Sequence, residues 1–163
     1  MDFKVYRISR IGFIRKSFLV YEGESIIYRA NKYGFFKKGF NVTDYHNALK
    51  FKIEYSPSLI GMKFNIVDNV GNQWAFIDKL FSFTKNNLIV ESVIGQLSIE
   101  GNFKRSEYTI IKDNLEIAKV SRNKWDSKQY VVLGVRSDIR QDIIIGITLS
   151  IVLKIQMQNS RRS

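Results

Sequence analysis

Short clusters of basic residues are the parts of this sequence whose residue types and spacing suit a chemical role, the binding of an anionic ligand. In the segment from Tyr33 to Phe40, aromatic residues are interleaved with two lysines. Such a segment can place its rings in a lipid headgroup layer while its lysines meet anionic lipid, or it can stack single-stranded bases. A hairpin with its phenylalanines in the core and its lysines in water has the same composition. The candidate anion-binding residues are Arg15, Lys16, Lys37, Lys38, Lys104, Arg105, Arg122 and Lys124.

Residues typical of catalysis and metal binding are scarce. The 163-residue chain has no cysteine and a single histidine, His46, so thiolate sites, disulfides and histidine clusters cannot form. It has no G-x-S-x-G nucleophile elbow, and Gly34 and Gly39 lack the following helix of a phosphate-binding loop. Carboxylate pairs are not excluded by spacing, but none is signalled. We therefore predict a protein that is not an enzyme, with no catalytic residues, metal site or cofactor.

The formal net charge of +11 is unevenly distributed along the chain. Residues 1–52 carry a net charge of +7 and residues 102–163 one of +6, whereas residues 53–101 carry −2. If the two chain ends adjoin, as ends often do, one flank of the molecule is strongly positive. Such a flank attracts anionic lipid, nucleic acid or an acidic protein surface. A general solubilising charge is the alternative explanation.

Alternation of apolar and polar residues dominates residues 3–135. In Leu49–Tyr55, four apolar residues alternate with three charged ones, which is typical of an antiparallel strand with one buried face. Eleven short strands separated by Gly, Asn and Asp turns predict a sandwich or a barrel. The other ten are Phe3–Ile8, Phe18–Tyr21, Ile26–Ala30, Lys63–Val67, Gln73–Asp78, Leu88–Ser92, Gln96–Ile99, Glu107–Ile111, Glu116–Ser121 and Tyr130–Val135.

An internal repeat with an offset of 44 residues favours the barrel. In each of two clear copies, the last aromatic residue follows the first by 17 residues. Phe18 and Phe35 have the same spacing and are a weaker third copy. Repeats of this period also occur in propellers, but about three copies followed by a helix fit a closed or nearly closed single barrel better. The two clear copies are Phe64-x-Ile66, Ala75-x-Ile77, Phe81 and Tyr108-x-Ile110, Ala118-x-Val120, Trp125.

The uncharged run of residues 143–153 predicts a helix over about residues 139–157. Asp138 is a plausible N-cap, and Gln141 would complete a capping box. Apolar residues cover nearly the whole circumference, so the helix must be enclosed by protein or lipid. Eleven uncharged residues are too few for a bilayer span, which needs about 20. We therefore predict no transmembrane span and burial inside the protein.

A closed sheet of this many strands leaves an interior that its own side chains cannot fill. The apolar helix would fit that space, so we predict that it runs through the middle of the barrel. A narrow small or polar stripe, from Asp142 through Gly146 and Ser150 to Lys154, would let a neighbouring backbone come close. The predicted central helix residues are Ile143, Ile144, Ile147, Leu149, Ile151 and Val152.

The repeated motif, the segment Lys124-Trp125-Asp126-Ser127 leading into Tyr130, and the terminal apolar helix together resemble LURP-one-related proteins. These belong with the tubby carboxy-terminal domains and the phospholipid scramblases, and the resemblance covers nearly the whole chain. It implies a mainly β (α+β) domain over residues 1–163, with a barrel of about 12 antiparallel strands, over about residues 3–135, enclosing a central hydrophobic C-terminal helix.

The resemblance also implies candidate functions. Tubby domains bind phosphoinositides through basic surface residues, and scramblases are linked to calcium-dependent lipid movement, whereas LURP-one-related members have no settled activity. The region before the last helix offers only Asp138 and Asp142, too few oxygens for a calcium ion that takes six to eight. Calcium binding is not expected, and a scramblase role is the least favoured. No lysine or arginine can be matched to the tubby lipid pocket.

The favoured prediction is a non-enzymatic barrel that binds anionic phospholipid, such as a phosphoinositide, through a basic flank. A nucleic-acid-binding module and a regulatory protein-interaction barrel are the alternatives. The amino-terminal residues MDFKVYRISR lack the hydrophobic region of a signal peptide. We therefore expect a cytoplasmic protein, peripheral at the inner membrane surface, whose oligomeric state the sequence leaves open.

Overall fold

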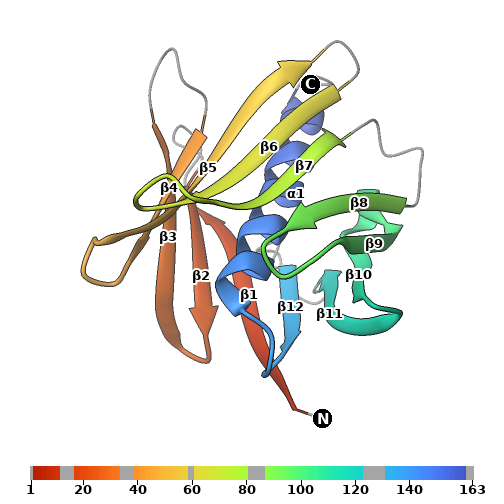
Figure 1. Ribbon diagram of the computed structural model, residues 1–163. Helices are drawn as coiled ribbons and strands as arrows, with labels where there is room; N and C mark the ends of the chain where they lie inside the picture. Colours follow the sequence, from red (N-terminus) through yellow and green to blue (C-terminus); the bar gives the residue numbers. More distant parts are fainter. Residues whose placement is uncertain are drawn as a thin grey trace.

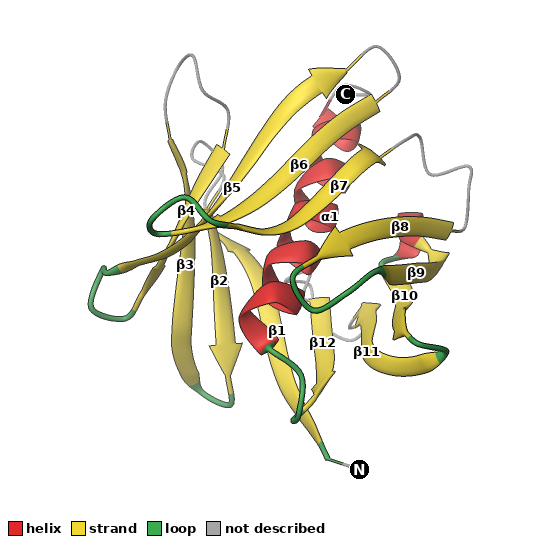
Figure 2. Ribbon diagram, viewed as in Figure 1, coloured by secondary structure: helices red, strands yellow, loops and turns green. Residues whose placement is uncertain are grey.

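The computed structural model describes residues 2–11, 17–33, 39–58, 61–80, 87–122 and 131–160. These residues form twelve β-strands, one short 3-10 helix (η1, Phe103–Arg105) and one α-helix (α1, Gln141–Ser160), as Figures 1 and 2 show. The strands are β1 (Phe3–Ile11), β2 (Ser17–Glu22), β3 (Ser25–Tyr33), β4 (Gly39–Asp44), β5 (Leu49–Ser58), β6 (Gly61–Asp68), β7 (Gln73–Leu80), β8 (Asn87–Ser92), β9 (Leu97–Asn102), β10 (Glu107–Lys112), β11 (Leu115–Arg122) and β12 (Val131–Arg136).

The strands form one closed antiparallel barrel. Each strand pairs with its neighbours in the sequence, and β1 pairs with both β2 and β12. In the closing pair, Lys4 lies opposite Val135 and Ile8 opposite Val131. Every strand thus has two neighbours, although β7 and β8 pair only through Ala75 with Ser92 and Phe76 with Glu91. The predicted barrel of about 12 antiparallel strands is confirmed.

The strand β4 is absent from the eleven strands that alternation predicts. Its Phe40 and Val42 face the core, whereas Asn41 and Thr43 are half-buried. Because this strand is short and begins at a glycine, its two apolar residues are too few to stand out as a pattern. The hairpin alternative for residues 33–40 is therefore correct for Phe40, while Phe35, Phe36, Lys37 and Lys38 lie outside the described residues.

The internal repeat corresponds to cross-strand pairs in hairpins four strands apart. In β6–β7, Phe64 lies opposite Ile77 and Ile66 opposite Ala75. In β10–β11 the equivalent pairs are Tyr108 with Val120 and Ile110 with Ala118. In β2–β3, Phe18 lies opposite Ala30. The register shifts directly after Val20, Ile66 and Ile110, and also after Val42 in β4. Such bulges increase local twist, which helps a sheet to close.

The helix α1 runs through the interior of the barrel (Figure 1). Ile143, Ile144, Ile147, Leu149 and Ile151 have no exposed surface, and Val152 is 7% exposed, so the predicted central helix is confirmed. Two polar side chains are also fully buried: the Thr148 hydroxyl donates to the Ile144 carbonyl and the Ser150 hydroxyl to the Gly146 carbonyl, both at 2.8 Å. Each hydroxyl thus finds its partner within the helix itself.

The predicted capping box is wrong. The helix begins at Gln141 and ends at Ser160, later than expected at both ends. The Arg136 guanidinium donates two hydrogen bonds to the Asp138 carboxylate, at 3.0 and 2.6 Å. The Gln141 side chain is also engaged elsewhere, because it accepts from the Tyr6 hydroxyl. A nearby arginine thus competes successfully for the carboxylate that would have capped the helix.

Along its stripe of small and polar residues, α1 packs against side chains of the barrel strands. A Cβ atom built on Gly146 would lie 3.2 Å from a ring carbon of Phe51 and 3.2 Å from the Ile66 Cγ2. The neighbours at this position are therefore core side chains of β5 and β6, and the close backbone approach predicted there is not observed. Among the described residues, no helix combines the length and hydropathy that a membrane crossing requires.

Candidate anion-binding site

The barrel has two different ends. We call the end at which α1 begins the amino rim, and the end at which α1 finishes the carboxyl rim. Asp2 lies at the amino rim, where its carbonyl accepts a hydrogen bond from the Ser137 backbone, whereas α1 ends at the opposite rim (Figure 1). Asp2 and the end of α1 are therefore apart, so the condition under which the two basic ends of the chain would form one flank is not met.

Three of the predicted anion-binding residues are described, and all three lie at the carboxyl rim. Lys104 and Arg105 belong to η1, which joins β9 to β10, and Arg122 is the last residue of β11. All three side chains are exposed. The other five predicted residues, Arg15, Lys16, Lys37, Lys38 and Lys124, lie outside the described residues. The described strand ends that flank them, Ile11, Ser17, Tyr33, Gly39 and Arg122, belong to the carboxyl rim.

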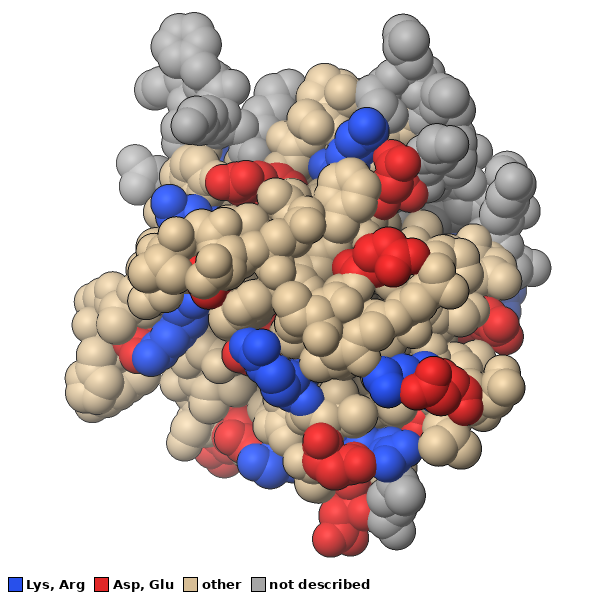
Figure 3. Space-filling view, viewed as in Figure 1, with Lys and Arg blue, Asp and Glu red and all other residues tan. Residues whose placement is uncertain are grey.

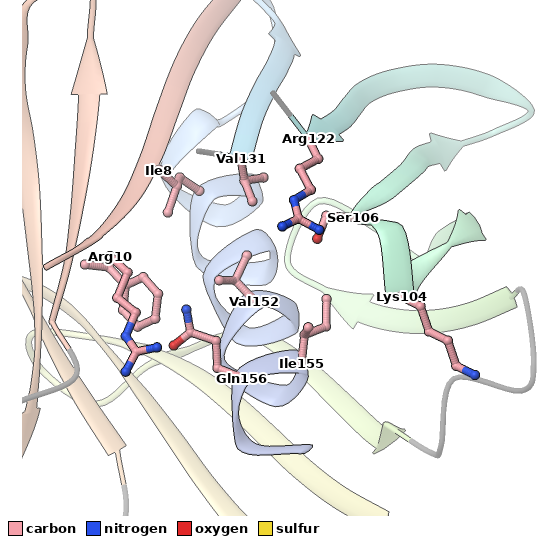
Figure 4. Close-up of a pocket in the computed structure, with 10 residues that line it drawn as sticks. Ile8, Arg10, Lys104, Ser106, Arg122, Val131, Val152, Ile155 and Gln156 are labelled. Atoms are coloured by element: carbon pink, nitrogen blue, oxygen red, sulfur yellow. The ribbon is translucent and has the colours of Figure 1, made fainter. Parts of the chain in front are cut away.

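A cavity of about 270 Å³ opens at the carboxyl rim beside the last turns of α1 (Figure 4). Its cationic lining comes from Arg10, Lys104 and Arg122. Two uncharged polar residues, Ser106 and Gln156, also line it. Its apolar wall is made by Ile8, Phe18, Val131, Val152 and Ile155. The structure thus brings two of the predicted residues, Lys104 and Arg122, to one cavity; Arg105 does not line it.

Strand alternation explains why two arginines face this cavity. Along β1, Tyr6 and Ile8 face the barrel interior, and Arg10 is the next residue in that row. Along β11, Ala118 and Val120 are followed in the same way by Arg122. Each arginine is thus an inward position at the mouth of the barrel, where the interior meets water and a charge is tolerated. In Figure 4 the Arg122 guanidinium lies near Ser106, and the Lys104 ammonium points outward.

The cations of this cavity lack acidic partners among the described residues. No described carboxylate lies within ion-pair distance of Arg10, Lys104 or Arg122. At the amino rim, by contrast, Lys50 pairs with Asp44 at 3.2 Å and Arg136 with Asp138. Arg10, Lys104 and Arg122 therefore present positive charge at the carboxyl rim that no described carboxylate pairs with.

One buried acceptor in the cavity lining has no partner. The Gln156 Oε1 atom is buried and accepts no hydrogen bond from any described residue. In Figure 4 the Gln156 amide and the Arg10 guanidinium extend into the space between β1 and α1. Because buried acceptors in native proteins nearly always have a donor, this oxygen is a position at which a bound water or ligand hydroxyl can donate.

In the sequence, the charge of the connecting segments differs with the strand that precedes them. In the sequence, the connections that follow odd-numbered strands, together with residues 161–163, contain eleven Lys or Arg and one acidic residue. The connections that follow even-numbered strands contain one Arg and three acidic residues. On the barrel face in Figure 3, blue and red side chains are interspersed. Of the eleven cations, the structure describes Lys104 and Arg105, and both lie at the carboxyl rim.

The described residues offer no other site with recognisable chemistry. No three His, Asp or Glu side chains among them gather in a way that could hold a metal ion. His46 lies in the exposed turn between β4 and β5, where its backbone N–H donates to the Asp44 carboxylate at 2.8 Å. Its ring meets that of Tyr45 edge-on at 4.6 Å between centroids. These contacts fit a turn residue.

Sequence reasoning missed Arg10 and Gln156. Arg10 had a usable signal, since it continues the alternating row Tyr6, Ile8 by one step. Gln156 had none, because it lies among the last residues of a helix whose position relative to the barrel mouth depends on the tertiary structure. The side chain of Ser106 also enters the lining only because η1 folds back onto the rim.

No protein-family model matches this chain, and no curated protein matches it at a significant level. The resemblance to LURP-one-related, tubby and scramblase proteins therefore stays a prediction that rests on the sequence motifs quoted above. The structure by itself establishes the architecture of the described residues, which is a closed antiparallel barrel of twelve strands with one C-terminal helix.

Proposed function

We propose that this protein is a non-enzymatic membrane-surface protein that binds anionic phospholipid headgroups through its carboxyl rim. The observation that supports the proposal is that Arg10, Lys104 and Arg122 line one cavity and have no described acidic partner. Arginine suits this role because its planar guanidinium can donate two parallel hydrogen bonds to one phosphate. Anionic lipids are concentrated in the cytoplasmic leaflet, which is therefore the proposed surface.

The expected affinity is low and sensitive to salt. A basic residue near an anionic membrane contributes about 1 kcal/mol, so Arg10, Lys104, Arg105 and Arg122 together would supply about 4 kcal/mol. That free energy corresponds to a dissociation constant of about 1 mM. Because exposed charges are screened within about 10 Å at moderate ionic strength, binding should weaken as salt is raised. Such binding is peripheral and reversible.

Nucleic acid fits the described rim less well than lipid does. Non-specific binding of single strands uses exposed aromatic rings on which bases stack. Among the described residues of the cavity lining, the only aromatic ring is that of Phe18, which is 1% exposed. The exposed aromatic residues Phe3 and Tyr45 lie at the amino rim, away from the cations of the cavity. The described carboxyl rim therefore offers charge without a stacking surface.

Vesicle flotation tests this function. The wild-type protein should float with vesicles that contain phosphatidylserine, should stay behind with phosphatidylcholine alone, and should float less as salt is raised. The double variant Arg10→Glu, Arg122→Glu should lose flotation. The matched control is Arg29→Glu, Lys119→Glu, which changes the net charge equally at exposed positions on the barrel wall.

Near-ultraviolet circular dichroism should show that both double variants fold like the wild type. Equal flotation with both kinds of vesicle would count against an electrostatic headgroup interaction. Equal loss of flotation in both double variants would show that only the net charge matters, and the assignment to the carboxyl rim would then be wrong.

A further inference from the structure

The cavity at the carboxyl rim has a feature that contact with a membrane surface does not require. Behind its cations lies an apolar wall to which β1, β2, β12 and α1 each contribute. A flat layer of headgroups needs only exposed positive charge, whereas a concave site with an apolar wall and a few polar groups is typical of a small-molecule site.

The apolar wall is accessible because the last turn of α1 is not fully covered by the barrel at this end. Residues 143–154 of α1 are buried, whereas Ile155, Gln156 and Met157 are half-buried. Val152 and Ile155 therefore face the cavity from the helix, and Phe18 faces it from the opposite wall. The inner residues Ile8 and Phe18 are each 1% exposed, so the wall continues directly into the hydrophobic core.

Polar groups stand at the outer end of this apolar wall. Arg10 and Arg122 supply guanidinium donors from opposite sides of α1 (Figure 4). The Gln156 Oε1 atom supplies an unsatisfied acceptor between the apolar wall and the cations. A ligand that satisfies all three features carries an anionic group, a hydroxyl or other donor beside it, and an apolar part that points inward.

We propose that this cavity binds one small amphipathic anion: a phosphate monoester joined directly to a short hydrocarbon chain. The phosphate lies at the mouth of the cavity, attracted by the charges of Arg10 and Arg122 on its two sides. Its protonated oxygen or a neighbouring hydroxyl donates to Gln156, and the chain lies against Phe18, Val152 and Ile155. This inference builds on the proposed function, because the same cations serve both, and it adds an apolar subsite and a ligand class.

The size of the cavity limits the ligand. Its volume of about 270 Å³ equals that of about nine water molecules, at about 30 Å³ each in the liquid. A phosphate and a few carbons fill that volume, whereas two long acyl chains do not fit. A free single-chain amphiphile fits as a whole, whereas a membrane phospholipid would place only its phosphate and the nearest carbons in the cavity.

Calorimetric titration with a series of alkyl phosphates tests the proposal. Inorganic phosphate, ethyl phosphate, butyl phosphate and hexyl phosphate should bind progressively more tightly. Each methylene that enters an apolar site should raise the affinity roughly fourfold, and the gain should stop once the cavity is full. Hexyl phosphate should therefore bind at least tenfold more tightly than inorganic phosphate. Hexanol should bind weakly because it lacks the anion.

Two variants separate the anion subsite from the chain subsite. Arg122→Gln should weaken the whole alkyl phosphate series by a similar factor, because it removes one guanidinium and leaves the apolar wall. Ile155→Trp should fill the cavity, so hexyl phosphate should then bind no more tightly than inorganic phosphate. The matched control is Ile89→Trp, which places the same side chain on the outer wall at β8, where Ile89 is exposed. The control should retain the full chain-length dependence.

The outcomes distinguish this inference from the proposed function. If hexyl phosphate binds no more tightly than inorganic phosphate, or if Ile155→Trp behaves like Ile89→Trp, the apolar subsite is wrong, whatever the vesicles show. If chain-dependent binding occurs without flotation, the site takes free amphiphiles and the membrane proposal fails. Displacement of the protein from anionic vesicles by hexyl phosphate would show that both sources use the same cavity. Should Ile155→Trp fail to fold, the alkyl series with wild type and Arg122→Gln decides the question.

Discussion

Gly146 of the central helix lies so close to Ile66 of β6 that a Cβ atom on the glycine would be 3.2 Å from the isoleucine Cγ2. The Phe51 ring is equally near, and both neighbours are completely buried. Close packing therefore favours glycine at this position, which opposes the cost of about 1 kcal/mol that glycine carries within a helix relative to alanine.

Gly146→Ala should lower the free energy of unfolding by about 1 kcal/mol. Overpacking of a well-packed core costs about 1–3 kcal/mol, which outweighs the gain in helix propensity of about 1 kcal/mol. Gly146→Leu should be more destabilising still. Urea unfolding measures both. Ser150→Ala, one helical turn further on, is the control and should change stability less; a stabilised Gly146→Ala protein would show that the neighbours can move apart.

Removal of the helix should abolish folding. A chain that ends at Arg140 loses the buried residues of α1, from Ile143 to Leu153, and leaves the barrel interior unfilled. We expect no near-ultraviolet circular dichroism signal and no cooperative thermal transition. A chain that ends at Ser160 is the control and should unfold cooperatively. A sharp transition in the shorter chain would contradict the role assigned to the helix.

The hydrogen bond from the Tyr6 hydroxyl to the Gln141 side chain joins β1 to the first residue of the helix. Burial, with smaller contributions from Glu22 and Tyr28, raises the pKa of Tyr6 from 10.0 to about 12. The free energy that the protonated Tyr6 hydroxyl contributes to folding is thus fully present below pH 10 and is lost as the pH rises towards 12. Tyr6→Phe should cost about 1 kcal/mol at neutral pH, and this difference should shrink between pH 10 and 12. Urea unfolding across that range checks it, and a constant difference would contradict it.

The Asp44 carboxylate should stabilise the protein at neutral pH and lose that effect in acid. Hydrogen bonds from the backbone of Ala48, together with Lys50 and the backbone of His46, hold its pKa below 3.8 despite partial desolvation. A lowered pKa stabilises the fold above the unfolded-state value, and the effect is lost as the pH falls through the folded-state value.

Asp44→Asn should therefore lower the melting temperature at neutral pH, and the difference from wild type should disappear at pH values well below 3.8. Asp113→Asn is the control, since Asp113 is exposed in the β10–β11 turn and has Lys112 beside it. It should change the melting temperature less. A difference for Asp44→Asn that persists in strong acid would show that something other than its charge is responsible.

The fold was largely predictable because its determinants are local. Alternation in segments such as Leu49–Tyr55 identifies strands, since side chains on successive residues face opposite sides of a sheet. The all-round apolar helix was predictable for the same reason, because its composition requires complete burial. β4 escaped detection, since Phe40 and Val42 are too few to form a pattern. The helix start was also misplaced, because Arg136 binds the expected cap residue Asp138.

The candidate site was predictable only in part. Lys104 and Arg122 each belong to a short basic cluster, so the local composition is enough to select them as candidates. Their common cavity depends on strand register, which pairs Arg10 with Phe18 and Arg122 with Val131 around the closing strands. Gln156 joins them from a residue 146 positions after Arg10, and no spacing rule connects the two.

The order of residues along the chain was sufficient to establish which side chains avoid water and with what period, and hence a β-rich chain with a fully buried helix. The residue pairs through which β1 and β12 close the predicted barrel, and the position of the chain ends at opposite rims, emerged from the three-dimensional arrangement. So did the cavity with an apolar wall that Arg10, Lys104 and Arg122 surround. The difference arises because hydrophobic periodicity acts over a few neighbouring residues, whereas register and closure depend on pairing between strands that are distant in the chain.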